Sequence, residues 1–144
     1  MKYLLDANCF TEVIRNRPNA VDVRLLLSQV PKSEFGLTDF ALHSLGIVML
    51  RHKVLDQLPV LIHDVGIGNE MSILTLTPSE LSLVVDACRT HRLDFDDSYQ
   101  YVAAELNGLI VVSFDTDFDR TPRGRLAPAT AFAQYTASRP NKNP

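Results

Sequence analysis

The sequence predicts a single α/β domain built around a mostly parallel sheet of four or five strands flanked by helices. Short apolar segments alternate with longer segments of helical spacing, a pattern typical of this fold class. Residues 109–112 are continuously apolar and rich in β-branched side chains, which indicates a strand buried on both faces. The 144 residues, 46% apolar and 22% charged, suffice for one core. We expect one domain over residues 1–137 and a loose tail over 138–144.

Four short apolar runs are the expected strands, and a polar residue or a glycine bounds most of them. Asp6 follows the first run, Thr38 follows the second, and Gly108 precedes the last. A short apolar run can be either a strand or a buried piece of helix. The assignment to strands therefore depends in part on the flanking residues. The expected strands cover residues 3–5, 34–37, 72–76 and 109–112.

Segments with apolar residues three or four positions apart are the expected helices. Thr38 has the side chain of an N-cap, and Asp39 is an acid in the first turn, where the helix dipole favours negative charge. Pro59 is expected to disturb its helix, and Gly66 with Gly68 to end it. The expected helices cover residues 8–15, 19–30, 39–52, 54–65, a segment that begins at Pro78, residues 94–107 and residues 128–135.

Acidic side chains follow the expected strands. Asp6 ends the first strand directly, and Asp115 comes three residues after the fourth. Parallel strands bring their carboxyl ends to one edge of the sheet, which is where α/β proteins bind ligands. Residues 94–119 contain seven acids and no lysine or arginine. A solvated surface also explains such a run, but the position of the acids at strand ends and helix starts favours a site.

The acids predict a particular chemistry. Carboxylates that converge without a basic partner repel one another, and this repulsion raises their pKa values unless a cation binds. Oxygen ligands select Mg²⁺ or Mn²⁺ rather than zinc. Such an ion lowers the pKa of a bound water and allows it to attack a phosphodiester. We therefore expect metal-dependent phosphodiester hydrolysis.

Three stretches of the chain carry a resemblance to a known family: Leu4-Leu5-Asp6-Ala7-Asn8, Asp97 with the helix behind it, and Val111-Val112-Ser113-Phe114-Asp115-Thr116-Asp117-Phe118. They resemble the PIN-domain ribonucleases. The resemblance extends from Lys2 to about Tyr135, and the small single-domain form is similar to VapC-type toxins of bacterial toxin–antitoxin pairs. It implies a parallel sheet flanked by helices, divalent-metal-dependent cleavage of RNA, frequent dimerisation and a small antitoxin partner.

The resemblance also implies a set of site residues. Asp6, Asp97 and Asp115 would be catalytic and hold Mg²⁺ or Mn²⁺, with Asp117 as a further acid on the metal side. The family usually has a Glu five residues beyond a Ser/Thr cap in the helix after the second strand. Counting from Thr38 gives His43, so the usual second acid is missing or replaced.

Two residues of that helix are alternative substitutes for the missing acid. A neutral imidazole at His43 can ligate Mn²⁺ but is a poor ligand for Mg²⁺. Asp39 lies four residues earlier and faces the same side of a helix. Each residue also has an ordinary structural role open to it, as a first-turn acid or as a packed histidine.

Several neighbouring residues carry two interpretations. Asn8 either lines the site or caps the first helix, and Ser113 either orients Asp115 or only ends its strand. Arg120, Arg123 and Arg125 lie within six residues directly after the acids. They either clamp RNA phosphates beside the metal or form a solvated loop that balances the aspartates.

Two other classes of protein compete with a nuclease. Asp115-x-Asp117-x-Asp119 suggests a calcium loop, but an EF-hand needs Gly and Glu where Arg120 and Leu126 stand, so that class is excluded. The open alternative is a PIN-like module that binds RNA or a protein and has lost strong catalysis together with the missing Glu.

Composition limits the cellular compartment and the binding partners that are expected. The two distant cysteines suit a reducing cytosol and do not form a disulfide framework or a zinc site. No apolar stretch reaches about 18 residues, so no spanning helix is expected, and Asp6 comes too early for a signal peptide. The net charge of −3 makes any RNA binding local. We expect a cytoplasmic homodimer with an RNA substrate and an antitoxin partner.

Overall fold

A computed structural model of the protein describes residues 1–138. Its five strands form one sheet in which every neighbouring pair is parallel, in the order β3-β2-β1-β4-β5. Of the expected tail at 138–144, Ser138 is the C-cap of the last helix, and residues 139–144 lie outside the described residues. The strands are β1 (Tyr3–Leu5), β2 (Phe35–Thr38), β3 (Ser72–Leu74), β4 (Ile110–Val112) and β5 (Arg125–Leu126).

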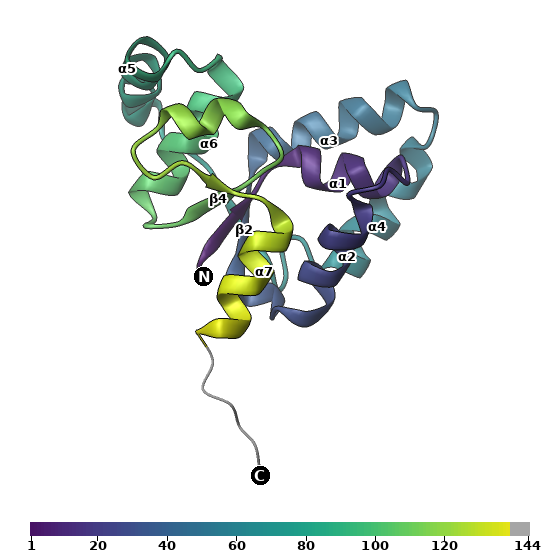
Figure 1. Ribbon diagram of the computed structural model, residues 1–144. Coiled ribbons are helices and arrows are strands. Elements are labelled where there is room, and N and C mark those ends of the chain that lie inside the picture. Colours follow the sequence, from purple (N-terminus) through teal and green to yellow (C-terminus); the bar gives the residue numbers. More distant parts are fainter. Residues whose placement is uncertain (139–144) are drawn as a thin grey trace.

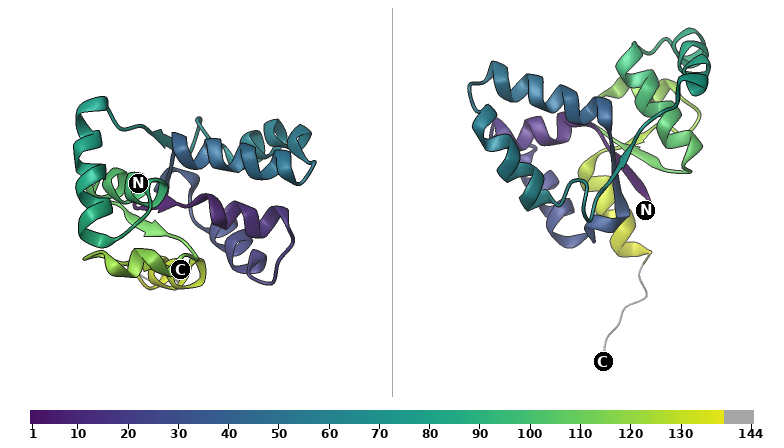
Figure 2. Two further views of the ribbon diagram at one scale, coloured as in Figure 1. Left: turned by 90° about the horizontal axis from the view of Figure 1, so that it is seen from above. Right: turned by 180° about the vertical axis from the view of Figure 1, so that it is seen from behind.

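Helices cover both faces of this sheet, as the sequence predicted. Figures 1 and 2 show α5 and α6 on one side of it and the group α1 to α4 on the other. No helix within residues 1–138 combines the length and the apolar character needed to cross a membrane. The helices are α1 (Ala7–Ile14), α2 (Ala20–Gln29), α3 (Asp39–Arg51), α4 (Leu58–Val65), α5 (Leu81–His91), α6 (Phe95–Leu106) and α7 (Pro128–Ala137).

The sheet divides the apolar interior into two clusters. Successive side chains of a strand point to opposite faces, so Tyr3 and Leu5 pack into the larger cluster and Leu4 into the smaller one. The larger cluster takes buried residues from α1, α2, α3 and α7, and the smaller takes them from α5 and α6. All three β1 side chains are fully buried, which explains the continuously apolar sequence of this central strand.

Some element boundaries differ from the sequence prediction. Pro59 does not disturb a helix; it lies in the first turn of α4, where its missing N–H costs nothing. A separate 3₁₀ turn at Leu55–Gln57 precedes that helix. Gly66 ends α4 with a φ of 74°, as expected of a left-handed C-cap. The sequence analysis did not predict β5, because this strand has only two half-buried residues, one of them Arg125, and no apolar run marks it.

The parallel sheet places three strand ends at one edge. β1 lies between β2 and β4, and the carboxyl ends of β1 and β2 lead directly into helices. Asp6 is the N-cap of α1, and the Thr38 hydroxyl accepts a hydrogen bond from Ala41 N at 3.0 Å at the start of α3. The polar residues that end these strands are therefore also helix caps, and they collect at the edge where such sheets bind ligands.

Candidate functional site

Four aspartates from three separate parts of the chain form an acidic cluster at the carboxyl edge of the sheet: Asp6, Asp97, Asp115 and Asp117. Asp6 follows β1, Asp97 is in the first turn of α6, and the other two follow β4. The Asp97 side chain shows that the charges interact. Burial raises its pKa to about 7, with further contributions from the negative charges of Asp94 and of the other three acids. The convergence predicted from the strand ends is confirmed.

Asp6 is the most buried member of the cluster, with 7% of its surface exposed. Its Oδ2 accepts a hydrogen bond from the Ser113 hydroxyl at 2.7 Å, and its Oδ1 accepts one from Gln100 Nε2 at 3.2 Å. Burial raises the pKa of the Asp6 carboxyl group, while these bonds favour the charged form. The negative charge of Asp115 adds to the rise. Asp6 is thus a carboxylate held in one orientation but poorly compensated in charge.

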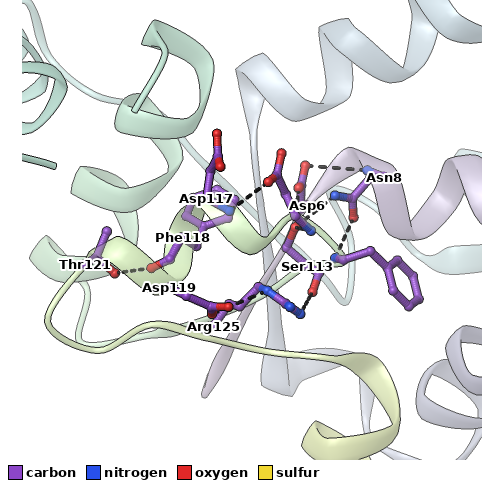
Figure 3. Close-up of polar contacts among 10 residues, drawn as sticks. Asp6, Asn8, Ser113, Asp117, Phe118, Asp119, Thr121 and Arg125 are labelled. Carbon is purple, nitrogen blue, oxygen red and sulfur yellow. Dashed lines mark hydrogen bonds and ion pairs between the residues drawn. The ribbon is translucent and has the colours of Figure 1, made fainter. Parts of the chain in front are cut away.

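Ser113 is the centre of the hydrogen bonds that join β1 to β4 (Figure 3). Besides donating to Asp6, its hydroxyl accepts hydrogen bonds from Asn8 Nδ2 at 2.8 Å and from Asp115 N at 2.9 Å. The side-chain oxygen Oδ1 of Asn8 in turn accepts a hydrogen bond from Phe114 N at 3.3 Å. Ser113 therefore orients Asp115 and does not merely end its strand. The interpretation of Asn8 as the helix cap is wrong, because Asp6 holds that position.

Asp115 and Asp117 lie on a 3₁₀ turn at Thr116–Arg120. Asp115 is the N-cap of this turn, and its Oδ1 accepts a hydrogen bond from Asp117 N at 2.8 Å. Asp117 forms an ion pair with the Arg120 guanidinium at 2.6 Å. The side chain of Asp117 is therefore partly neutralised within the protein.

The three arginines do not gather beside the acids. Arg123 bonds to the carbonyl oxygen of Leu109, which precedes β4, and pairs with Glu105 at the end of α6. It therefore lies toward the amino end of β4, away from the acidic cluster. Arg120, which pairs with Asp117, is the arginine nearest the acids, and it also donates to the carbonyl oxygen of Arg92 at 2.8 Å.

The Arg125 side chain is largely buried and bonded to neighbouring residues of the protein (Figure 3). Its side chain is 16% exposed, and one guanidinium nitrogen donates to the carbonyl oxygen of Ser113 at 2.8 Å. Another nitrogen lies 3.5 Å from an Asp119 carboxylate oxygen. These contacts tie β5 to the end of β4, so Arg125 supports the segment that carries the acids.

The two candidates on α3 occupy different environments. The Asp39 Oδ1 accepts hydrogen bonds at 3.0 Å from the Tyr99 hydroxyl of α6 and from Phe40 N. His43 is exposed, and it lines a shallow groove on α3 together with Asp39. The predicted shared face of these residues is confirmed. Within residues 1–138, no hydrogen bond or ion pair joins His43 to the aspartates.

Gln100 is a site residue that the sequence analysis missed. It lies three positions after Asp97 on α6, so both side chains belong to one face of that helix. This spacing was the only sequence signal for it, because an isolated glutamine has no distinctive motif. Tyr99 was also missed; its ring stacks on Phe40 with the ring centroids 4.2 Å apart.

The donor set of the acidic cluster fits a hard divalent cation. Its members are carboxylates, which Mg²⁺ and Mn²⁺ prefer, and in the described chain the Asp97 carboxylate accepts no hydrogen bond from the protein. Within residues 1–138, no three His, Cys, Asp or Glu side chains are close enough together to form a completed metal site. A bound cation would therefore require these carboxylates to move closer together than they lie here.

The comparisons with known proteins agree with the fold. The family model described as PIN domain matches residues 3–124. A toxin–antitoxin complex from Klebsiella pneumoniae has a TM-score of 0.69 at 16% identity, covering 88% of this chain and 98% of that one. PAE2754 from Pyrobaculum aerophilum has a TM-score of 0.69 at 17% identity, covering 96% and 97%.

A further solved structure is similar. It is VapBC2 from Rickettsia felis bound to a DNA fragment from its promoter, with a TM-score of 0.64 at 16% identity, covering 88% of this chain and 97% of that one. At these identities the likeness shows the fold alone. No curated protein matches the chain in sequence.

Proposed function

This chain belongs to the PIN domain family, and from that premise we propose that it is a divalent-metal-dependent endoribonuclease of the toxin type. The observation that supports this proposal is the convergence of Asp6, Asp97 and Asp115 at one sheet edge, where burial, together with the neighbouring negative charges, raises the pKa of Asp97 to about 7. Near neutral pH this cluster needs a cation or a proton for compensation. A protein that keeps such a cluster has a site suited to binding a metal.

In the proposed mechanism, Asp6, Asp97 and Asp115 would hold Mg²⁺ or Mn²⁺, and Asp117 is the acid beside them. When bound, such an ion would lower the pKa of a water and stabilise negative charge on the scissile phosphate. Ser113 and Asn8 keep Asp6 and the backbone of Asp115 in place through the bonds described above. In the metal-free protein the pKa of Asp97 is raised to about 7. Because a proton on this carboxyl group competes with the ion, metal affinity should fall as pH decreases through that value.

The toxin assignment draws on the solved relatives. Two of them are described as a toxin–antitoxin complex and as VapBC2 on promoter DNA. By analogy we propose that this protein acts on RNA in the cytoplasm, binds a small antitoxin protein and forms a homodimer. RNA phosphate binding by Arg120, Arg123 and Arg125 stays a prediction, and the contacts favour Arg120 because it pairs with Asp117.

Replacing two of the acids tests the nuclease proposal. Asp6→Asn and Asp115→Asn should each abolish cleavage of RNA in Mg²⁺ or Mn²⁺, because Asn keeps the shape and removes the charge that holds the ion. The far-UV circular dichroism spectrum should stay unchanged. Asp86→Asn, which alters an exposed acid on α5, is the matched control and should cleave normally. Full metal-dependent cleavage by either cluster variant would refute the proposed site.

A second function is favoured by one observation. His43, at the position where the family usually has an acid, is exposed and has no bond to the cluster within residues 1–138. A site that is one acid short supports a PIN-like module that binds RNA or a protein without efficient cleavage. Wild-type protein that retains RNA on a filter in both metals but leaves it intact would favour this alternative.

A further inference from the structure

We infer that Gln100 is a positioning residue of the acidic cluster, whose N–H holds the Asp6 carboxylate and whose Oε1 accepts a hydrogen bond from a water held there with the cation. This inference rests on the proposed function. It concerns a residue that no motif identified and that acts through Asp6 and through water.

The first half of the inference comes from the contact with Asp6. Gln100 Nε2 donates to Asp6 Oδ1 at 3.2 Å, while the opposite oxygen of the same carboxylate is held by Ser113. Both Asp6 oxygens are thus fixed, one from α6 and one from the end of β4. Only the amide nitrogen of Gln100 can donate, so the charge of Asp6 also determines which way the amide points.

The second half comes from the other end of the same amide. Gln100 is only 5% exposed, and its Oε1 is buried with no hydrogen-bond partner within residues 1–138. A buried acceptor without a partner costs free energy, and folded proteins usually satisfy such atoms with protein or with ordered water. Ordered water commonly donates to such atoms, and we assign that role to a water molecule here.

The geometry of the amide limits how far this donor can lie from Asp6. In an amide with bonds of about 1.23 and 1.33 Å, the oxygen and the nitrogen are roughly 2.2 Å apart. Since the nitrogen lies 3.2 Å from Asp6 Oδ1, Oε1 lies at most about 5.4 Å from that carboxylate. One water molecule can bridge such a distance between two acceptors. A cation bound by Asp6 would supply waters in this region.

The helix offers a matched control. Ser98 Oγ is a second buried atom of α6 without a partner among the described residues, and it makes no bond to Asp6. Ser98→Ala removes this orphaned hydroxyl, and Gln100→Met removes both ends of the amide while keeping its length. Methionine fills irregular buried space without polar atoms, so the fold should persist.

The experiment is calorimetric titration of Mg²⁺ and Mn²⁺ into the wild type, Gln100→Met and Ser98→Ala, with thermal melting of each metal-free protein. Loss of groups that orient metal ligands commonly weakens metal affinity by about 10–100-fold. We expect that loss for Gln100→Met, with a cooperative melting transition that shows the variant to be folded. Ser98→Ala should keep the wild-type affinity. Unchanged affinity in Gln100→Met, or an equal loss in both variants, would overturn the inference.

A spectroscopic measurement separates this inference from the proposed function. In the metal-free wild type, the Gln100 side-chain amide protons should exchange slowly with solvent, and Asp6→Ala should remove that protection. Addition of Mg²⁺ should then shift the Gln100 side-chain carbonyl ¹³C signal with the calorimetric affinity. If neither ion binds the wild type, the proposed function fails, and the cation half of the inference fails with it. If ions bind and this signal stays still, only the inference about Oε1 is refuted.

Discussion

Replacing Asp97 by Asn should stabilise the metal-free protein at pH 8. The Asp97 carboxyl group has a pKa of about 7 in the folded protein against an ordinary value of 3.8. The folded protein therefore keeps a proton that the unfolded chain has released between about pH 4 and 7. The free energy of unfolding therefore decreases as pH rises from about 4 to 7, and above pH 7 it stays at the decreased value. Asn has the same shape and no charge, so the variant escapes this loss.

The size of the gain follows from the same values. A shift from 3.8 to about 7 is roughly three pKa units, which at 1.36 kcal/mol per unit sets a ceiling of about 4 kcal/mol. Asp97 is only half-buried, and solvent screens its interactions, so we expect on the order of 1–2 kcal/mol. For a protein of about 150 residues, this is a rise in Tm of roughly 2–8 °C. The backbone N–H of Asp97, which donates to the Asp94 cap, is unaffected.

Thermal melting followed by circular dichroism, in chelator at pH 4, 6 and 8, measures this effect. The gain from Asp97→Asn should be largest at pH 8 and small at pH 4. Asp96→Asn is the matched control, because Asp96 is an exposed neighbour on the same turn of α6. Added Mg²⁺ should raise the Tm of the wild type more than that of Asp97→Asn, since a ligand stabilises the state that binds it. An equal Tm for Asp97→Asn and Asp96→Asn at pH 8, or a gain independent of pH, would refute the argument that burial and neighbouring charges penalise the Asp97 carboxylate.

Three further substitutions test other parts of the site. Arg125→Ala should lower the free energy of unfolding in urea by about 1–3 kcal/mol, because it leaves the Ser113 carbonyl oxygen without this donor and removes the ion pair with Asp119; an unchanged midpoint would contradict its structural role. Thr38→Ala should cost about 1 kcal/mol through loss of the cap of α3, and Thr38→Ser should restore most of it. His43→Glu should raise Mg²⁺ affinity in calorimetry, because it adds a hard anionic oxygen at the family's acid position; unchanged affinity would contradict that assignment.

The order of the elements and the edge at which the acids meet could be predicted from the sequence because their signals are local. β1 and β4 are apolar runs that end at polar residues, and the polar residues after them begin the next turn or helix. Once the sheet is parallel, Asp6 and Asp115 must share an edge. Thr38 and Gly66 act as expected because a cap depends on a few neighbouring residues.

Tertiary structure alone decided which side chains touch within that edge. The bond from Gln100 to Asp6 joins residues 94 positions apart, and the bond from Asn8 to Ser113 joins residues 105 positions apart. Neither Gln100 nor Asn8 lies in a periodic sequence pattern from which its partner could be predicted. The three arginines are close together in the sequence. In the folded protein, however, Arg123 lies toward the amino end of β4, and most of the Arg125 side chain is buried against the other end of that strand. Local pattern determines where the backbone goes, but a polar contact depends on how distant elements pack, because its partner is chosen only when they meet.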